Sequence, residues 1–206
     1  MNQEQVWNKI AEKWSMYRKT PPQEVVEFLS TKKGRVLDLG CGSGRNIIPN
    51  SNIEYFGVDF SLEMLKFAEK SAKKKKANAA FFKSFLSELP FKSNFFNAAI
   101  FISTLHCIPE PEDRKNALKE LYRVLKKGGE AMVTVWNKEQ NPIAQKLGAK
   151  EGFINWKKDN YNFQRYYYFY EADELKKLLK SIGFKILNKA NEGKHSIKNI
   201  IFYVGK

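Results

Sequence analysis

The sequence predicts an α/β fold built on a mostly parallel sheet, and three observations support this prediction. Short apolar and β-branched runs alternate with longer segments of helical periodicity, which is the pattern of βαβ units. The run 97–102 is almost entirely apolar, as expected of a central strand buried on both faces. Two final β-rich segments follow one another without a helix and predict an antiparallel pair. We therefore expect a Rossmann-like, seven-stranded, mostly parallel sheet with a C-terminal antiparallel strand pair and helices on both faces.

Residues 1–30 predict two helices ahead of the sheet. Apolar side chains between Val6 and Met16 recur at helical spacing, and a Thr-Pro-Pro sequence then breaks the pattern. A second helix is predicted over 23–30. We expect this helical N-terminal lead to lie over a cofactor pocket.

The central part of the chain alternates between predicted strands and helices. Strands are predicted over five segments: 35–39, 53–58, 79–83, 97–102 and 130–136. Helices are predicted over three segments: from about 44, over 62–74 and over 112–125. Ser61 is the expected N-cap of the second helix, and the pair Gly128-Gly129 is the expected C-cap of the third.

The alternation stops after residue 136. Residues 137–168 hold many aromatic, Lys and Asn residues and are long for a connection, so we interpret 137–170 as a substrate-facing insertion. One helix and two strands are predicted beyond it: 171–181 ended by Gly183, then 184–190 and 197–204 with 191–193 between them. No linker or internal repeat divides the chain, so 1–206 are predicted to form one domain.

Composition restricts the setting and the partners. The chain has 206 residues, is 43% hydrophobic, and has no apolar run near the ~18–20 residues that cross a membrane. We expect no secretory signal peptide and no membrane association. Cys41 and Cys107 lack metal-ligand spacing, which predicts no metal site and a reduced, cytoplasmic setting. The net charge of +14 favours a polyanionic partner, most simply nucleic acid, over a merely solvated lysine-rich surface such as 73–76.

The segment 35–44, Arg-Val-Leu-Asp-Leu-Gly-Cys-Gly-Ser-Gly, is the most informative part of the sequence. Three glycines follow Asp38 at alternate positions: Gly40, Gly42 and Gly44. Glycine lets a backbone approach a ligand or adopt positive φ, and Asp59 at the end of the next strand is placed to accept both hydroxyls of a ribose. Dinucleotide sites use G-x-G-x-x-G and hold a pyrophosphate at a helix N-terminus, so G-x-G-x-G after an acidic residue indicates a different ligand. The plain alternative is a glycine-rich turn without a ligand.

This motif, together with Asp59, Leu89-Pro90-Phe91 and the helix–Gly-Gly–strand pattern at 112–136, resembles the class I S-adenosyl-L-methionine (SAM) methyltransferases. The resemblance covers essentially the whole chain and implies SAM as cofactor. It implies the following cofactor-binding residues: Asp38, Gly40, Cys41, Gly42, Gly44, Asp59, Phe60, Ser84, Phe85 and Ser103. Many members hold the adenine amino group with an Asp about five residues before the proline. Ser84 or Phe85 occupies that region here, so no acidic residue is carried over.

Three further patches resemble the tRNA wobble-uridine carboxymethyl methyltransferases, the family that includes the methyltransferase domain of the AlkB-homologue-8 fusion. They are Ile10-Ala11 with 15–21, 103–106 with Arg114, and 165–171. The chain departs from the family at His106-Cys107, where a second His is frequent, and at Pro22-Gln23, where Trp-Pro is frequent. The resemblance implies a tRNA substrate and methyl transfer to the carboxylate of 5-carboxymethyluridine.

A carboxylate acceptor is already ionised at neutral pH and needs no strong general base. The enzyme must desolvate and position it, which is worth up to ~7–11 kcal/mol in intramolecular systems. A guanidinium is the natural carboxylate clamp. The candidate catalytic residues are Arg165, Tyr167, His106 and Arg18.

Each of these residues has a simpler interpretation. Arg165 is otherwise a surface arginine of a basic protein, and Cys41 is a small apolar filler beside the glycine loop. His106 is a substrate-facing donor, a weak base or a core histidine. The tyrosines of 166–170 either stack on an extruded base or bond to it, and alternation along an extended segment places about half of the four in the core.

Two other functions stay open at this point, namely a small-molecule methyltransferase on the same fold and a catalytically silent SAM-binding RNA module. Some members of the resembled family need a small zinc-binding activator subunit at a sheet edge near the third strand. The apolar residues of 79–85 suit such an edge, and an ordinary edge strand packed on its own helix is the alternative.

Overall fold

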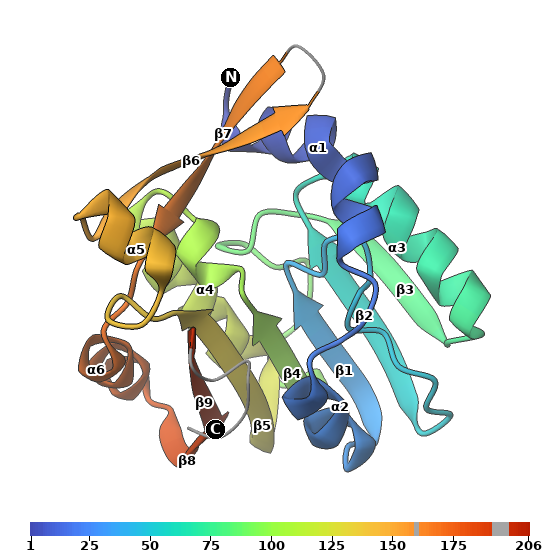
Figure 1. Cartoon of the computed structure of the whole chain (residues 1–206). Helices are drawn as coiled ribbons and strands as arrows, with labels where there is room; N and C mark the ends of the chain where they lie inside the picture. Colours follow the sequence, from blue (N-terminus) through green and yellow to red (C-terminus); the bar gives the residue numbers. More distant parts are fainter. Residues whose placement is uncertain (159–160, 191–197) are drawn as a thin grey trace.

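The computed structural model describes residues 1–158, 161–190 and 198–206. In these residues a seven-stranded sheet with the order β3-β2-β1-β4-β5-β9-β8 forms the centre of the molecule (Figure 1). Its strands are β1 (Gly34–Leu39), β2 (Ile53–Asp59), β3 (Ala79–Lys83), β4 (Phe96–Ile102), β5 (Leu125–Trp136), β8 (Lys185–Ala190) and β9 (Asn199–Gly205). Strands β1, β2, β3, β4 and β5 all run parallel to one another, and β9 runs antiparallel to both β5 and β8. The predicted sheet and its C-terminal antiparallel pair are confirmed.

Helices cover both faces of the sheet because successive strand side chains point to opposite faces. Leu37 and Leu39 of β1 face the core beneath α4 (Pro111–Val124) and α6 (Ala172–Ile182). Val36 faces the opposite core beneath α2 (Gln23–Ser30) and the C-terminal end of α3 (Leu62–Lys75). The predicted Ser61 N-cap and Gly183 C-cap are confirmed, since Ser61 Oγ accepts from Met64 N at 3.2 Å and Gly183 has a φ of +115°.

The predicted helix from about residue 44 is wrong, because the described chain forms only turns between β1 and β2. Pro49 supplies no backbone donor and disfavours helical geometry at the residue before it. Without a helix, the backbone carbonyl oxygens of this segment lack the N–H donors that a following helical turn would supply. Lys75 of α3 supplies donors instead, because its Nζ donates to the carbonyl oxygens of Gly44, Arg45 and Ile47 at 3.4, 3.2 and 2.7 Å. The segment after the glycines is therefore held as a compact turn that ends close to α3.

The predicted glycine C-cap of the 112–125 helix is also wrong. Helix α4 ends at Val124, and Leu125 already has extended backbone angles and pairs with Phe96 of β4. Ala98 then pairs with Glu130, so the residues between Leu125 and Glu130 bulge out of the ladder. The glycines serve this bulge, where Gly128 has a φ of +75° and its N–H donates to Lys206 O at 2.9 Å.

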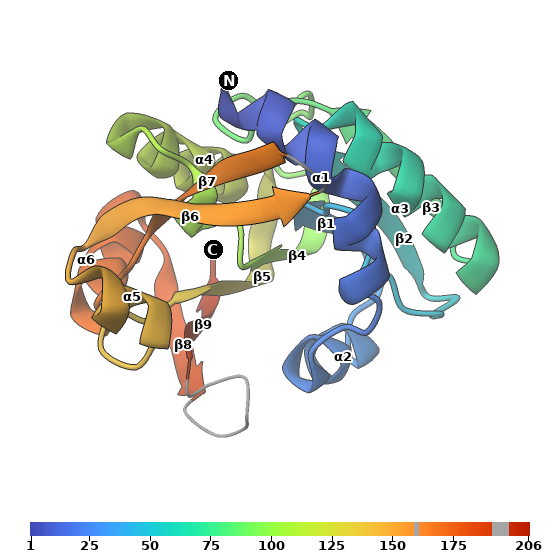
Figure 2. The ribbon, with the colours of Figure 1, turned by 45° about the horizontal axis from the view of Figure 1, so that its top comes forward.

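The insertion after β5 contains regular structure. It forms α5 (Pro142–Leu147) and an antiparallel hairpin of β6 (Glu151–Lys158) and β7 (Tyr161–Tyr168). Figure 2 shows this hairpin extending from the side of α5 and α6 to α1 (Gln3–Tyr17). The side-chain amide of Gln3 joins the two, accepting from Tyr166 N at 3.0 Å and donating to Gln164 O at 3.1 Å. The connection 191–193 between the two final predicted strands lies outside the described residues.

Candidate functional site

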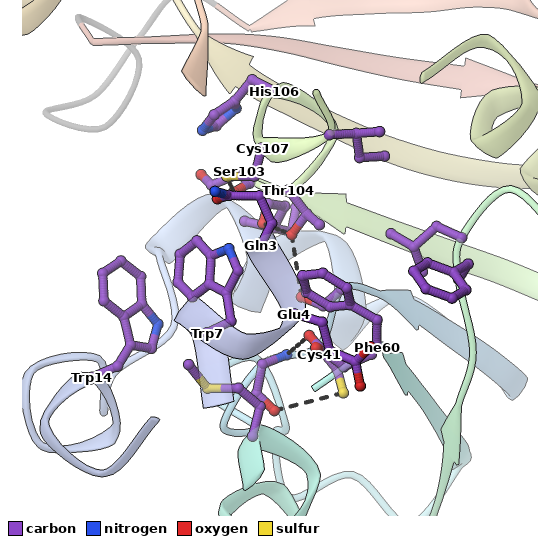
Figure 3. A pocket seen from close by; sticks show the side chains of 18 of the residues that line it. Gln3, Glu4, Trp7, Trp14, Cys41, Phe60, Ser103, Thr104, His106 and Cys107 are labelled. Atoms are coloured by element: carbon purple, nitrogen blue, oxygen red, sulfur yellow. Dashed lines mark hydrogen bonds between the residues drawn. The ribbon is translucent and has the colours of Figure 1, made fainter. Parts of the chain in front are cut away.

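A cavity of about 400 Å³ lies at the carboxyl ends of β1, β2, β4 and β5, beneath α1 and the hairpin. The strand order reverses between β1 and β4, which is where doubly wound sheets bind their ligands. Figure 3 shows Trp7 and Trp14 of α1 among the side chains that line the cavity, together with His106, which follows β4. The predicted helical lead thus borders the pocket.

The glycine loop after β1 forms one wall. Gly40 has a φ of +66°, and a Cβ at this position would lie 2.1 Å from the Thr104 methyl group, so only glycine fits between the two loops. Gly42 has a φ of +51° and no atom within 4 Å of its Cβ position, which leaves its backbone open to a ligand. Its N–H donates to Asp59 Oδ2 at 2.9 Å, which connects the loop to the end of β2.

Asp59 and Phe60 continue this wall. The second oxygen of Asp59 accepts from Ser61 N at 2.9 Å, so the carboxylate is fixed by backbone donors on both oxygens. Burial raises the pKa of Asp59 to about 6. The Phe60 ring lies 6.2 Å from the ring of Phe85, a side chain that is 63% exposed and lines the same cavity.

Asp38 lies fully buried beneath the glycine loop rather than in the cavity wall. It accepts hydrogen bonds from Tyr55 Oη and, at 3.3 Å, from Asn46 Nδ2. Burial raises its pKa to about 7. Among the described residues, Asp38 Oδ1 and Asn46 Oδ1 have no donor, and Asn46 lines the cavity, so its oxygen is an acceptor available to a cationic ligand.

Arg18 and Arg45 bring positive charge to the cavity. Both line it, and neither forms an ion pair within the described part of the chain. Burial, assisted by the nearby Arg18, lowers the pKa of Arg45 to about 10. Asp38 offsets the desolvation of Arg45 only in part and without a direct ion pair, so this part of the cavity suits an anionic group.

His106 lies in the short 3₁₀ turn after β4 and is buried against Trp136, at a ring-centroid distance of 5.1 Å. Its Nδ1 accepts from Trp136 N at 3.2 Å. Burial, and secondarily the charge of Arg18, lowers the pKa of His106 to about 3. The ring is therefore neutral near pH 7, and because Nδ1 is an acceptor the proton is on Nε2.

Tyr167 also stacks on Trp136, with centroids 4.4 Å apart and planes 4° apart, and its ring lies 5.7 Å from that of His106. Tyr167 lines the cavity. Its Oη accepts from Arg165 Nη1 at 2.6 Å. Arg165 itself lies behind Tyr167, outside the cavity wall. Its guanidinium carbon is 5.0–5.9 Å from the ring centroids of Trp7, Trp14, Trp156 and Tyr167.

The tyrosines around Tyr167 are more buried than alternation along a strand predicts. Tyr166, Tyr167 and Tyr170 are buried and Tyr168 is half-buried. Arg114 explains this, because its Nη1 donates to Tyr166 Oη at 3.2 Å and its guanidinium lies 4.3 Å from the Tyr168 ring centroid. The outward face of β7 is thus covered by α4 and by the loop before it.

Comparison with known proteins identifies the chemistry of this cavity. The family model for a methyltransferase domain matches residues 36–129, which carry the glycine loop, Asp59 and the strands around them. The chain belongs to the class I SAM-dependent methyltransferases. This confirms the class and the cofactor predicted from the motif that begins at Asp38.

Three relatives of this methyltransferase are named tRNA (carboxymethyluridine(34)-5-O)-methyltransferase. The Schizosaccharomyces pombe protein is 28% identical over 208 residues, covering 89% of this chain and 88% of its own length. The Xenopus tropicalis protein is 34% identical over 137 residues, 66% of this chain and 21% of that protein. The Arabidopsis thaliana protein is 36% identical over 138 residues, 66% of this chain and 32% of that protein. The match thus spans only a fifth to a third of the latter two proteins.

Solved structures agree with the fold of this methyltransferase. A SAM-dependent methyltransferase from Methanosarcina mazei has a TM-score of 0.75 at 21% identity, covering 91% of this chain and 98% of its own. The PH0226 protein from Pyrococcus horikoshii has a TM-score of 0.71 at 22% identity and covers 88% of both chains.

The residues of the cavity fit SAM. The unpartnered oxygen of Asn46 suits the ammonium of the methionine tail, with Asp38 buried directly behind Asn46, and Arg45 suits the carboxylate of that tail. Asp59 has the predicted place for the ribose, and Phe60 with Phe85 provides apolar surface for the adenine. When bound, the cofactor supplies a methyl group on a sulfonium.

The methyltransferase assembles most of the predicted cofactor residues at the cavity: Gly40, Cys41, Gly42, Asp59, Phe60, Phe85 and Ser103. Asp38, Gly44 and Ser84 do not line it, and Asp38 is buried beneath the glycine loop. Gly44 makes room for Ala68 of α3, whose Cα would lie 2.9 Å from a Cβ at Gly44. Ser84 Oγ donates to Glu88 O at 2.6 Å and stabilises the following turn, so Leu86 and Ser87 line the cavity there instead.

Sequence reasoning missed several cavity residues: Trp7, Trp14, Arg45, Asn46, Thr104 and Trp136. Trp7 and Trp14 occur at helical spacing that also suits a core position. Arg45 and Asn46 were not predicted as cavity residues, because the segment after the glycines was expected to form a helix. Trp136 ends a predicted strand, and its position at a strand carboxyl end was a usable signal.

Proposed function

We propose that this methyltransferase acts on tRNA and methylates the carboxylate of 5-carboxymethyluridine at the wobble position of the anticodon. The activity named for its relatives and the net charge of +14 support this substrate. The cavity carries the proposal, because it combines an unpaired arginine with neutral hydrogen-bond donors in a largely apolar wall. Those groups suit an anionic acceptor that enters already ionised.

Arg18 is the clamp for the acceptor carboxylate in this proposal. It follows α1, lines the cavity and lies 5.0 Å from the Trp14 ring centroid. Arg18, His106 and Tyr167 line the same cavity, and the charge of Arg18 acts to lower the pKa of the other two, although burial has the larger effect on each. A guanidinium forms two parallel hydrogen bonds with a carboxylate and so fixes its orientation.

His106 donates to the acceptor through Nε2 in this proposal, since Nδ1 is occupied by Trp136 N–H. A pKa of about 3 makes the ring too weak a base to remove a proton near pH 7. Of the three roles left open by the sequence, the structure favours the hydrogen-bond donor. Binding a carboxylate requires that role and does not require a base.

Arg165 acts through Tyr167 and is a positioning residue rather than a clamp. Its N–H occupies a lone pair of the Tyr167 hydroxyl, so the hydroxyl proton is directed away from Arg165. Tyr167 lines the cavity, and burial holds its pKa well above the ordinary value, so it remains a proton donor. We infer that 137–170 faces the substrate through this hairpin, within one methyltransferase domain that comprises 1–206.

A small zinc-binding activator subunit is part of the proposal, with β3 as its docking edge. Strand β3 ends the sheet and pairs only with β2 among the described strands. Lys83, the last residue of β3, forms an ion pair of 2.8 Å with Glu4 of α1, so a subunit on this edge would adjoin the cavity roof. No helix in the described part of the chain is long and apolar enough to cross a bilayer.

A tritiated-SAM transfer assay tests the function. The substrate is tRNA that carries 5-carboxymethyluridine, with and without the candidate zinc-binding subunit, and the product is treated with mild alkali. We expect alkali-labile label in wild type and its loss in Arg18→Met. Alkali-stable label would indicate transfer to another RNA atom. SAM binding without label in RNA would favour a small-molecule substrate or a silent module.

A further inference from the structure

Among the described aromatic side chains that no part of the proposed reaction uses, Tyr17 is the most exposed one beside a cavity residue. It is the last residue of α1 and is 74% exposed, although the adjacent Arg18 lines the cavity. Its ring is 6.1 Å from that of Trp156, which in turn is 5.5 Å from Trp14. One side of Tyr17 is thus supported by the aromatic cluster around Arg165, while most of the ring faces solvent.

The sequence on either side of Tyr17 is basic. The segment 13–20, Lys-Trp-Ser-Met-Tyr-Arg-Lys-Thr, contains three basic residues and no acidic residue. Lys157, which follows Trp156 in β6, is exposed as well. An exposed aromatic ring among cations is the usual arrangement for single-stranded nucleic acid, since the ring stacks on a base and the cations contact phosphates.

Entry of one nucleotide into the cavity creates a need for such a ring. The cavity lies beneath α1 and the hairpin and has a volume of about 400 Å³, so a base reaches it only after leaving its stack. The neighbouring base then loses a stacking partner. An aromatic side chain just outside the cavity replaces that partner and reduces the free energy needed to extrude the target.

We propose that Tyr17 is a stacking platform for the base next to the target nucleotide in a single-stranded RNA loop. This inference rests on the proposed function, because it requires an RNA substrate whose modified base enters the cavity. Arg18 then holds the acceptor group inside, while Tyr17 holds the adjacent base outside. The end of α1 thereby contributes to both substrate binding and loop recognition.

Three variants test the platform with an anticodon stem-loop RNA. Tyr17→Ala removes the ring, Tyr17→Phe keeps it, and Leu187→Ala removes an exposed apolar side chain from β8 at the far edge of the sheet. We expect Tyr17→Ala to raise the Kd and KM for the RNA by roughly 5- to 150-fold, the usual effect of losing one stacked base. Tyr17→Phe and Leu187→Ala remain within about twofold of wild type, and SAM affinity is unchanged in all three.

A stem-loop with 2-aminopurine next to the target gives a second measurement. We expect the fluorescence of 2-aminopurine to be quenched when it stacks on the aromatic ring at position 17 of wild type or Tyr17→Phe. Binding to Tyr17→Ala gives no such quenching. Equal RNA affinity and equal quenching in wild type and Tyr17→Ala would overturn the platform while wild-type methylation of tRNA still upheld the proposed function. A wild-type protein that binds SAM but neither binds nor methylates RNA would overturn both.

Discussion

Replacing Tyr167 by Phe tests the claim that Arg165 acts through the tyrosine hydroxyl. The substitution removes one oxygen and keeps the ring stacked on Trp136. It leaves Arg165 Nη1, which donates to that oxygen at 2.6 Å, without this acceptor. Arg165 Nε already lacks a partner among the described residues, so the guanidinium has little means of compensation.

The expected loss of stability follows from this geometry. A hydrogen bond to a charged group contributes ~1.5–3 kcal/mol, and a buried donor left unsatisfied costs a similar amount. We expect the free energy of unfolding of Tyr167→Phe to fall by about 2 kcal/mol, which lowers Tm by about 4–8 °C in a chain of this length. The double variant Arg165→Met/Tyr167→Phe removes both partners, and the methionine fills the aromatic cage, so we expect at least 1 kcal/mol to be regained.

Activity measurements separate the role of Tyr167 as the acceptor for Arg165 from its proposed role as a hydrogen-bond donor to the substrate. Loss of a donor to an anionic acceptor lowers kcat/KM by about 10- to 150-fold, and the double variant does not recover it. Urea unfolding, calorimetric titration with SAM and methyl transfer to tRNA are measured for both variants, and SAM affinity is expected to stay at the wild-type value. Wild-type stability and activity in Tyr167→Phe would refute the reasoning.

Two further predictions concern the cofactor wall. Gly40→Ala is expected to destabilise the protein by more than ~2 kcal/mol and to abolish SAM binding, because a φ of +66° is strained for alanine and the Cβ would lie 2.1 Å from the Thr104 methyl group. Thermal melts with Thr104→Ala added should show partial recovery, and none would contradict the steric argument. Asp38 has its pKa raised by burial from 3.8 to about 7, so between these values the folded protein keeps a proton that the unfolded chain releases, and stability falls as pH rises through this window. Asp38→Asn should therefore lose less stability than wild type between pH 4 and 7 in urea unfolding, and parallel pH profiles would disprove the assignment.

The strands and the glycine loop were predictable because their signals are local. A buried parallel strand needs a continuous apolar run, as in 97–102, and the loop at Gly40 needs glycine for both its positive φ and its contact with Thr104. The turn after Gly44 was not predictable in the same way, because its carbonyl oxygens are held by Lys75, about thirty residues further along the chain. Periodicity cannot show such a long-range partner.

The place of Arg165 shows the same limit at the site. The Arg-Tyr-Tyr sequence predicts an arginine at the substrate, and alternation along a strand predicts that Arg165 and Tyr167 share a face, which their hydrogen bond confirms. Which of the two reaches the cavity depends on Trp7, Trp14 and Trp156, which come from two separate segments and surround the guanidinium. Alternation along a strand predicts the face on which a side chain lies, whereas tertiary packing determines which residues that side chain contacts.

The charge balance of the cavity explains why water must be excluded by α1 and the hairpin. A carboxylate loses its charge when it becomes an ester, so the transition state is less charged than the bound acceptor. Removing water therefore raises the free energy of the acceptor more than that of the transition state, provided that the remaining contacts are few and oriented. Arg18, His106 and Tyr167 line the cavity and are the contacts that the proposed function assigns, and the Gln3 bonds to β7 keep the two parts of the roof together. Breaking that connection with Gln3→Ala would admit water while leaving Arg18, His106 and Tyr167 in place.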